Sequence, residues 1–257
     1  MIYSDILDTI GNTPSIKIKN ISLNGTNLYV KAEYFNPASS VKDRLALSII
    51  NNAEKKGVLK KGQTIVEATS GNTGIGLALV CASKNYPLVV TMPDSASIER
   101  RKLMRFLGAK VLLTPASEGG TGAYNKAKKL VDKNKWFYAR QFENEDNAKI
   151  HEETTGIEIY DDFKEIGLDY WVSGYGTGGT FTGVSRLLRE KMPKTKLILT
   201  EQMLRHLSVV IIFKKEIQMA QRLNLILLGI LIQFKDGQPI LFLLYFKKPL
   251  MKNIMMN

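Results

Sequence analysis

The sequence predicts an α/β fold built around a largely parallel sheet. Up to about residue 201, short runs of β-branched residues alternate with segments of helical periodicity, which is typical of βαβ units. Glycine and proline fall at the junctions between these segments, where turns are needed. At 257 residues, 44% of them hydrophobic, the chain is long enough to bury one large core or two modest ones.

Each element follows from its local pattern. Strands are expected where short apolar runs lie between turn residues, which in order are 64–68, 88–92, 110–113, 137–140, 170–173 and 196–200. Helices are expected where apolar residues recur with a helical period, first after Lys42 and then at 75–84, 97–107, 123–134, 149–163 and 182–191. Because strands and helices alternate, each helix is expected to connect two parallel strands of the sheet.

The formal net charge of +12 is unevenly spread. Residues 202–257 carry eight lysines and arginines against two acidic residues, whereas the chain before them is only mildly basic. This segment also loses the glycine-punctuated alternation and has no clear period or helix caps. We therefore predict no nucleic-acid partner, because the body lacks the excess of positive charge that phosphate binding uses, and we separate residues 202–257 from the domains before them.

The composition also argues against a metal site and against a membrane-spanning segment. The single cysteine, Cys81, cannot form an internal disulfide and makes a poor metal set with two distant histidines, so we expect no bound metal. Cys81 falls on the apolar face of an expected helix, which favours a core position. No apolar stretch reaches the roughly 20 residues that cross a bilayer, and no signal sequence opens the chain. We expect a cytoplasmic protein with no membrane partner.

Lys42 stands at the expected start of the first helix, after Ser39 and Ser40 as N-cap candidates. The positive end of the helix dipole lowers the pKa of an amine there and favours the neutral form that condenses with a carbonyl group. Taken alone, the pattern also fits an ordinary exposed lysine compensated by Asp43.

Two segments, 67–76 and 173–180, each join an expected strand to an expected helix through small hydroxyl, amide and glycine residues. Backbone N–H groups, hydroxyls and the helix dipole make such a junction a cradle for a phosphate or carboxylate, although each also fits a tight turn with capping residues. The second junction matches G-x-G-x-x-G at Gly174, Gly176 and Gly179, and Glu201 follows about 20 residues later, which keeps a dinucleotide site open.

Two more polar residues stand out. Gln141 ends an expected strand, where its amide can reach a cleft at the carboxyl edge of the sheet. His151 lies in a helical stretch beside Glu152 and Glu153, which favours a structural or surface role over a catalytic one.

Five blocks resemble, in order and spacing, the cysteine synthases (O-acetylserine sulfhydrylases) of the fold-type II pyridoxal-phosphate enzymes. They are the run from Asn36 to Arg44, SGNTG at 70–74, Gln141 with Phe142, HEETTG at 151–156 and GTGGT at 176–180. The runs 10–14 and 92–101 fit too, so the resemblance covers residues 3–201. It implies two three-layer αβα domains with mostly parallel sheets, as in the tryptophan synthase β subunit.

The resemblance also implies domain limits and residue roles. Residues 1–145 would form the N-terminal domain, with the first 35 or so able to pack on the other domain, and 146–201 would begin the cofactor domain. Lys42 would carry pyridoxal 5'-phosphate, Asn72 would bond its ring hydroxyl, and the phosphate cup would comprise Gly176, Thr177, Gly178, Gly179 and Thr180. The substrate carboxylate would be bound by Thr69, Ser70, Gly71, Asn72, Thr73 and Gln141.

The implied reaction is a β-replacement, in which O-acetyl-L-serine loses acetate and sulfide adds to give L-cysteine. The cofactor is the electron sink, and Lys42 is both its covalent anchor and the base. The resemblance further implies a homodimer, if the fold is intact, and serine acetyltransferase as a partner.

The resemblance ends near Glu201. A nucleotide string encoding Glu-Pro-Asp-Ala-Ala-Pro-Leu, a typical family continuation, encodes the run Glu201 to Leu207 once a single C is deleted. A second family-like string, read in the same shifted frame, gives Gln233 to Leu243. We therefore predict that residues 202–257 are an out-of-frame tail, that the C-terminal domain is incomplete and that activity is weak or absent.

Three alternatives stay open. Cystathionine β-synthase or another β-replacing relative would share the lysine and both cradles. A non-catalytic binding or regulatory paralogue would be indifferent to the loss of Lys42. A dinucleotide oxidoreductase would depend on the Gly174 junction alone.

Overall fold

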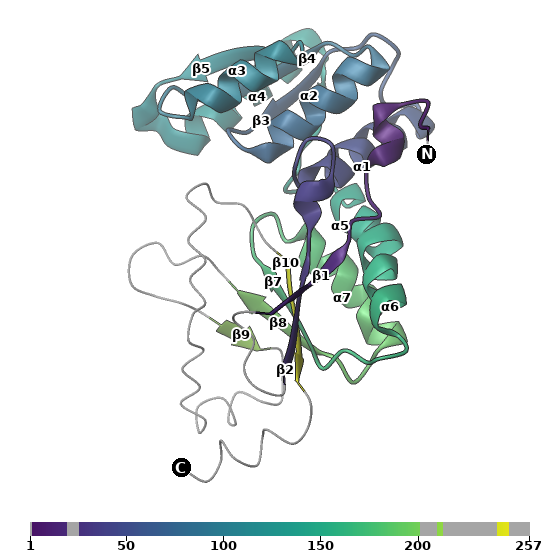
Figure 1. Ribbon diagram of the computed structural model, residues 1–257. Helices are drawn as coiled ribbons and strands as arrows, with labels where there is room; N and C mark the ends of the chain where they lie inside the picture. Colours follow the sequence, from purple (N-terminus) through teal and green to yellow (C-terminus); the bar gives the residue numbers. More distant parts are fainter. Residues whose placement is uncertain (1, 20–25, 201–209, 213–240, 247–257) are drawn as a thin grey trace. The chain divides into compact units, whose positions relative to one another are not determined.

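The computed structural model describes residues 2–19, 26–200, 210–212 and 241–246 (Figure 1). The chain forms two compact units, the first comprising Met1–Asn12 with Tyr34–His151 and the second Thr13–Glu33 with Glu152–Asn257. No helix in the described part of the chain is long and apolar enough to span a membrane.

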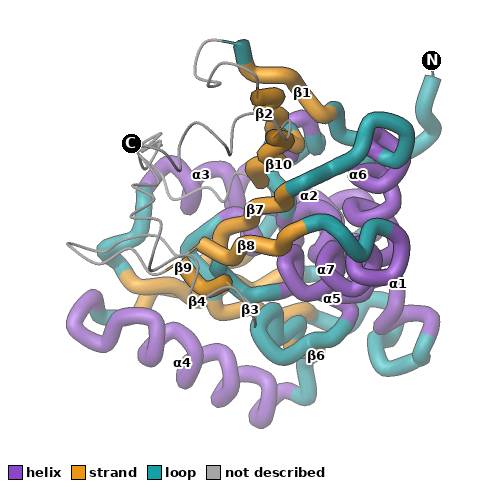
Figure 2. Tube along the Cα trace, turned by 90° about the horizontal axis from the view of Figure 1, so that it is seen from below, coloured by secondary structure: helices purple, strands orange, loops and turns teal. Residues whose placement is uncertain are grey.

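The first unit is a three-layer αβα sandwich. Its sheet contains four parallel strands in the order β5 (Lys110–Thr114), β4 (Leu88–Pro93), β3 (Ile65–Ala68) and β6 (Phe137–Tyr138). One face is covered by α1 (Lys42–Lys55), α2 (Asn72–Lys84) and α3 (Ile98–Phe106), and the other by α4 (Gly119–Asn134), as Figures 1 and 2 show. The predicted α/β class is confirmed here.

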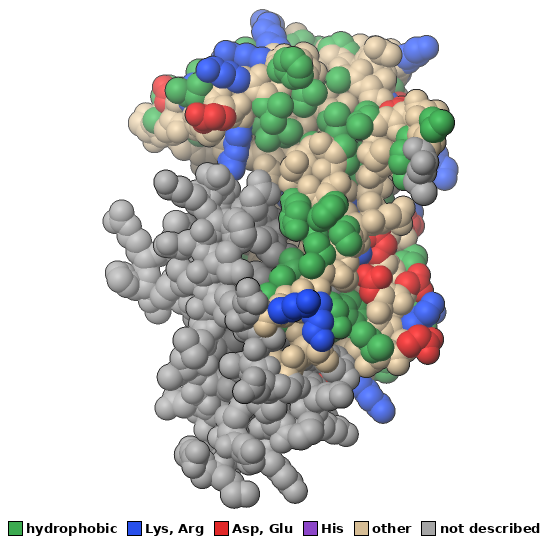
Figure 3. Space-filling model, viewed as in Figure 1, with side chains coloured by type: hydrophobic (Ala, Val, Ile, Leu, Met, Phe, Trp, Pro, Cys, Tyr) green, Lys and Arg blue, Asp and Glu red, His purple; other side chains and the backbone are tan. Residues whose placement is uncertain are grey.

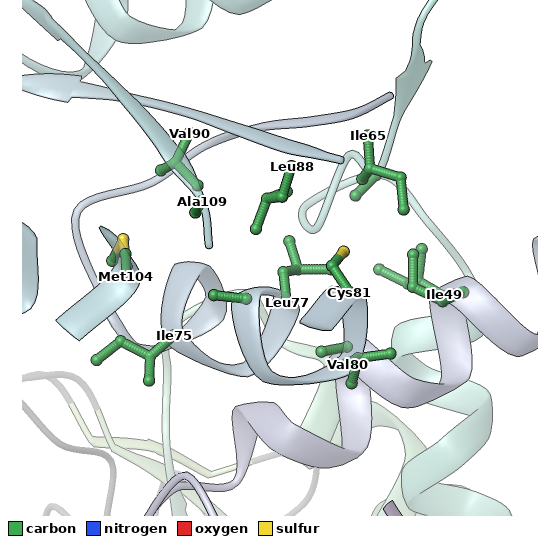
Figure 4. Packing of buried hydrophobic residues seen from close by; sticks show 14 of the residues in the cluster. Ile49, Ile65, Ile75, Leu77, Val80, Cys81, Leu88, Val90, Met104 and Ala109 are labelled. Atoms are coloured by element: carbon green, nitrogen blue, oxygen red, sulfur yellow. The ribbon is translucent and has the colours of Figure 1, made fainter. Parts of the chain in front are cut away.

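The core of this unit lies between the sheet and the helices α1 to α3. Leu77 and Cys81 of α2 face Leu88 and Ile65 of the sheet, with Ile49 of α1 beside them (Figure 4). Cys81 is buried, which confirms its predicted core position. Because burial raises the pKa of its thiol to about 12, the sulfur stays protonated and unreactive near neutral pH.

The second unit contains a six-stranded sheet. The strand order is β1 (Ser15–Ile18), β2 (Thr26–Lys31), β10 (Leu241–Phe246), β7 (Tyr170–Gly174), β8 (Lys196–Thr200) and β9 (Val210–Ile212). β7 and β8 pair in parallel, whereas the other pairs are antiparallel. The mostly parallel pairing expected for both domains therefore describes the first unit, because in the second the early and late segments of the chain add antiparallel strands.

Helices α6 (Gly156–Phe163) and α7 (Gly179–Lys191) supply the apolar core of the second unit. Their buried residues Phe163 and Leu188 pack in one cluster with Trp171 of β7. Residues 202–257, predicted to be an out-of-frame tail, lie outside the described residues except for β9 and β10.

A buried ion pair connects the segment Thr13–Glu33 to helix α6 within the second unit. The Lys31 side chain is 1% exposed, and its Nζ lies 2.9 Å from a Glu158 carboxylate oxygen on α6. The same Nζ donates to the Thr13 carbonyl oxygen at 2.5 Å. Since a buried ammonium is costly unless it is paired, these contacts fix β2 against α6.

Two predicted elements end differently. The helix expected at 149–163 is interrupted, since a π-helical turn (His151–Thr155) separates α5 (Asp146–Ile150) from α6. The strand expected at 137–140 stops at Tyr138, because Arg140 takes the left-handed conformation at φ +52°. This turn directs the next residue, Gln141, away from the strand path.

Charged side chains of the described residues are interspersed on the face that Figure 3 shows. Small groups of Lys and Arg and of Asp and Glu lie among apolar and uncharged polar side chains. The described residues on this face show no continuous basic stripe of the kind that tracks a phosphate backbone.

Candidate functional site

The first junction forms a tight turn between β3 and α2. The Thr69 N–H donates to the Thr91 carbonyl oxygen at 3.0 Å, and the Gly71 N–H donates to Thr69 Oγ1 at 3.2 Å. Helix α2 begins at Asn72, earlier than the predicted residue 75, so Asn72 and Thr73 belong to its first turn. The first N–H groups of a helix generally lack intrahelical partners, which is the physical basis of the anion-binding role predicted for this junction.

A hollow of about 440 Å³ lies at the carboxyl ends of β3, β4 and β6. Four of the predicted carboxylate-binding residues line it, namely Thr69, Ser70, Gly71 and Gln141. Asn72 and Thr73 are not part of its wall, but Thr73 contacts Gln141. Ligand sites of open α/β sheets form at this edge of the sheet.

Gln141 is held from several sides. Its Oε1 accepts from Thr73 Oγ1 at 2.5 Å, and its Nε2 donates to Glu67 Oε1 at 3.4 Å. Its backbone carbonyl oxygen accepts from Asn147 Nδ2 at 2.9 Å. Gln141 is 5% exposed, so little freedom is left to its amide. The structure thus connects two segments that lie far apart in the sequence, residues 67–73 and 141–147.

Glu67 is the site residue that sequence reasoning missed. It lies in the central strand β3 and is 1% exposed, and burial raises the pKa of its carboxyl to about 8. Nearby backbone N–H groups offset part of the rise. A carboxylate inside the apolar run Ile65 to Ala68 was the available signal, because a strand covered on both faces is normally apolar throughout.

We expect the chain to lose stability as pH rises from about 4.5 to 8, because Glu67 keeps its proton in the folded state and loses it in the unfolded chain over that window. The Glu67 contribution to the free energy of unfolding should fall by up to about 1.4 kcal/mol per pH unit. Urea denaturation at several pH values across this range measures the change in the free energy of unfolding. Glu67→Gln should flatten the slope, whereas Glu143→Gln, on an exposed residue of the same wall, should not; equal slopes in wild type and Glu67→Gln would contradict it.

Lys42 begins α1 as predicted, but the cap differs from the prediction. The N-cap is Val41, without a side-chain hydrogen bond, and Ser39 takes a left-handed conformation at φ +61°. Ser40 Oγ accepts from the Lys42 N–H at 3.2 Å, so only Ser40 serves the helix start. Burial lowers the pKa of the Lys42 amine to about 8, which adds a second cause to the predicted dipole effect and acts in the same direction.

Helices α1 and α2 meet closely at Lys42. A Cβ placed on Gly76 of α2 would lie 3.0 Å from the Lys42 carbonyl oxygen and 3.2 Å from its carbonyl carbon. The absence of a side chain at Gly76 therefore lets the helix with the anion cradle pack against the backbone of the lysine. The sequence showed both helices, but it did not show this contact.

Gly76→Ala should displace the start of α1, because the atoms that it meets are backbone and cannot move alone. We expect a stability loss of about 1–3 kcal/mol, measured by urea denaturation, and slower modification of Lys42 by an amine reagent. Gly74→Ala is the matched control, since its nearest contacts are the flexible end of Met104. An unchanged Lys42 modification rate in Gly76→Ala would contradict the expectation.

His151 is completely buried, so of the two roles favoured from the sequence the structural one fits and the surface one is wrong. Burial lowers the pKa of its imidazole well below the ordinary value, and the positive charges of Lys42 and Arg44 act in the same direction. The ring is therefore neutral near pH 7. Its position at the start of the π-helical turn places it at the sequence junction of the two units.

The second junction lies in the second unit, between β7 and α7. Gly178, the N-cap of α7, has φ +83°, a conformation that favours glycine, and Gly179 and Thr180 form the first turn of the helix. Gly176 and Thr177 precede them in the loop, and Thr177 Oγ1 accepts from the Gly179 N–H at 3.5 Å. A 13-residue helix that begins this way presents N–H groups suited to a phosphate.

Comparison with known proteins identifies the family. A model of the family described as "Pyridoxal-phosphate dependent enzyme" matches residues 6–207. The chain belongs to this family. A cysteine synthase of Flavobacterium sp. is 51% identical over 203 residues, which cover 78% of this chain and 66% of that protein. An O-ureido-L-serine synthase of Streptomyces lavendulae is 48% identical over 200 residues, covering 78% and 62%.

Solved structures agree. The crystal structure of a cysteine synthase from Entamoeba histolytica has a TM-score of 0.73 at 40% identity, with 77% of this chain and 60% of that chain covered. The resemblance inferred from the sequence blocks and the implied fold class are thereby confirmed. The chain spans about two thirds of the length of the curated relatives that it matches.

The residues present fit the family's cofactor. An aldehyde needs an amine that is neutral near physiological pH, which burial provides at Lys42. A phosphate needs a cluster of backbone N–H groups, which the glycine-rich start of α7 provides. The described residues thus include both attachment chemistries that pyridoxal phosphate requires.

Proposed function

We propose that the reaction of this chain is a β-replacement on O-acetyl-L-serine, which exchanges acetate for sulfide and yields L-cysteine. One observation carries the proposal: within the first unit, the backbone of Lys42, whose amine has a lowered pKa, lies against α2, the helix that begins with the proposed anion cradle. This packing supports the proposal because it connects the start of the lysine helix to the helix that would bind the substrate carboxylate.

The residues divide the work in the proposed reaction. Thr69, Ser70, Gly71, Asn72, Thr73 and Gln141 hold the α-carboxylate and so fix the direction of the α C–H bond. Pyridoxal phosphate, when bound, supplies the electron sink for the carbanion. Lys42 anchors it and takes the α-proton, a role for which a pKa near the working pH is suited. Asn72 bonds the cofactor's ring hydroxyl, and Gly176 to Thr180 hold its phosphate.

A related β-replacement is the second candidate. The 48% identity to an O-ureido-L-serine synthase and the hollow of about 440 Å³ favour an acceptor larger than sulfide. Cystathionine β-synthase chemistry, with homocysteine as acceptor, belongs to the same class. A non-catalytic role has no such support, because the lowered pKa of the Lys42 amine does not fit an ordinary exposed lysine compensated by Asp43.

The experiment is an acceptor comparison in the chain with its reading frame restored after Glu201. O-acetyl-L-serine would be offered with sulfide, homocysteine or hydroxyurea, and the amino-acid products separated. We expect cysteine to form at least about tenfold faster than the other products. A faster product from a larger acceptor would favour the second candidate, and no product from any acceptor would contradict the proposal.

Three further proposals depend on the resemblance to cysteine synthases. They are a homodimeric state, serine acetyltransferase as a partner and a cytoplasmic location. The out-of-frame origin of residues 202–257 is a fourth, and it is supported by the end of the family match at residue 207.

A further inference from the structure

The carboxyl of Glu67 has an unusual position for the central strand of a covered sheet. Its Oε1 accepts from Gln141, while Oε2 is buried without a hydrogen-bond partner among the described residues. Burying an incompletely bonded carboxyl costs free energy that an apolar side chain of similar size would not cost. A residue kept under such a cost has a use other than stability.

That use lies in the orientation of the Gln141 amide. A glutamine amide has two orientations, which exchange its oxygen and its NH2 group, and only the neighbours select between them. Here Thr73 donates to Oε1 at 2.5 Å and Glu67 accepts from Nε2 at 3.4 Å. Thr73 can also accept through its hydroxyl and would tolerate either orientation. Glu67 favours the observed one when the proton of its neutral carboxyl is on Oε2, because Oε1, the atom that faces the amide, is then only an acceptor.

The selected orientation suits an anion in the hollow. Gln141 lines the hollow beside Thr69 and Ser70. With one amide hydrogen on Glu67, the second hydrogen of Nε2 remains as a donor, whereas the reversed amide would present oxygen on this side. An oxygen there would repel a carboxylate, since both groups only accept.

We propose that Glu67 is a positioning residue, which holds the Gln141 amide so that its N–H is available to the substrate carboxylate. This inference rests on the proposed function, because the carboxylate belongs to the amino-acid substrate. In this role Glu67 acts through Gln141.

The charge of Glu67 gives the proposal a distinct pH signature. Up to about pH 8 the carboxyl is neutral, and above that pH it becomes an anion one side chain away from the carboxylate site. The other titratable groups of the wall are Tyr124 on α4, Tyr138 on β6, and Arg140 and Glu143 after β6. Burial and the charge of Glu67 raise the pKa of Tyr138, so the tyrosine remains neutral in the same range. Carboxylate binding should therefore weaken above about pH 8.

The test is an NMR titration of the full chain with L-serine in wild type, Glu67→Gln, Glu67→Leu and the control Ser48→Ala. Ser48 is buried and donates to the Asp146 carbonyl oxygen, away from the hollow. We expect Glu67→Leu to bind about tenfold more weakly, Glu67→Gln and Ser48→Ala to stay within about twofold of wild type, and the weakening above pH 8 to vanish in Glu67→Gln. Thermal melts show which variants fold.

The outcomes separate two failures. Wild-type affinity in folded Glu67→Leu, or an unchanged pH profile in Glu67→Gln, overturns the positioning role while leaving the proposed function intact. Folded wild-type protein that does not bind L-serine at any pH contradicts the proposed function, and the inference falls with it.

Discussion

Lys42→Ala is expected to remove covalent attachment of pyridoxal phosphate and to reduce β-replacement by about 10³-fold or more. The physical reason is the pKa of about 8, compared with an ordinary value of 10.5. At pH 7 roughly one amine in ten is then neutral, against about one in three thousand for an exposed lysine.

Borohydride reduction of cofactor-treated protein, followed by peptide mapping, measures the attachment. The label should map to Lys42, and its yield should rise with pH up to about 8 and then level off, because the neutral amine is the reactive form. Lys60→Ala, which changes an exposed lysine, is the matched control and should keep the full label. A label on another lysine would contradict the assignment.

If residues 202–257 are an out-of-frame tail, as proposed, restoring the reading frame after Glu201 is expected to have the second-largest effect on activity. The family match ends at residue 207, and the chain spans about two thirds of the length of its curated relatives. The restored chain should bind pyridoxal phosphate as a yellow protein and turn over at least about 100-fold faster than the present chain, because a complete second domain would orient the cofactor correctly.

Sequencing the gene across codons 200 to 245 is the first measurement. DNA that cannot encode the family continuation after a single-base insertion would remove the frameshift hypothesis. Comparing cofactor absorbance and cysteine formation in the two versions is the second. Full activity of the present chain would contradict the prediction even if the DNA permitted it.

The local features of the candidate site could be predicted from the sequence. The strand-to-helix junctions at 67–76 and 173–180 and the helix that starts at Lys42 were all predictable, since each depends on residues within a few positions of one another. The residue types also indicated an anion-binding role, because glycine, hydroxyl and amide groups at a helix start bind anions.

The missed features depend on partners far apart in the chain. Glu67 meets Gln141 across 74 residues, and Thr73 meets Gln141 across 68. The left-handed conformation of Arg140, which shortens β6, leaves no pattern in a strand-like run. The burial of His151 was equally invisible, because a histidine next to two glutamates resembles a surface residue.

The sequence by itself determined that this protein has an α/β fold of the pyridoxal-phosphate-dependent enzyme family, and it predicted the roles of Lys42 and of two anion cradles. Three features were visible only in the tertiary structure. The lack of a side chain at Gly76 lets α2 pack against the backbone of Lys42, and the buried Glu67 hydrogen-bonds Gln141. Residues 13–33 belong to the second unit. The division has a physical reason: periodicity and turn chemistry are set by neighbours along the chain, whereas burial, and the pKa values that follow from it, are set by which surfaces meet on folding.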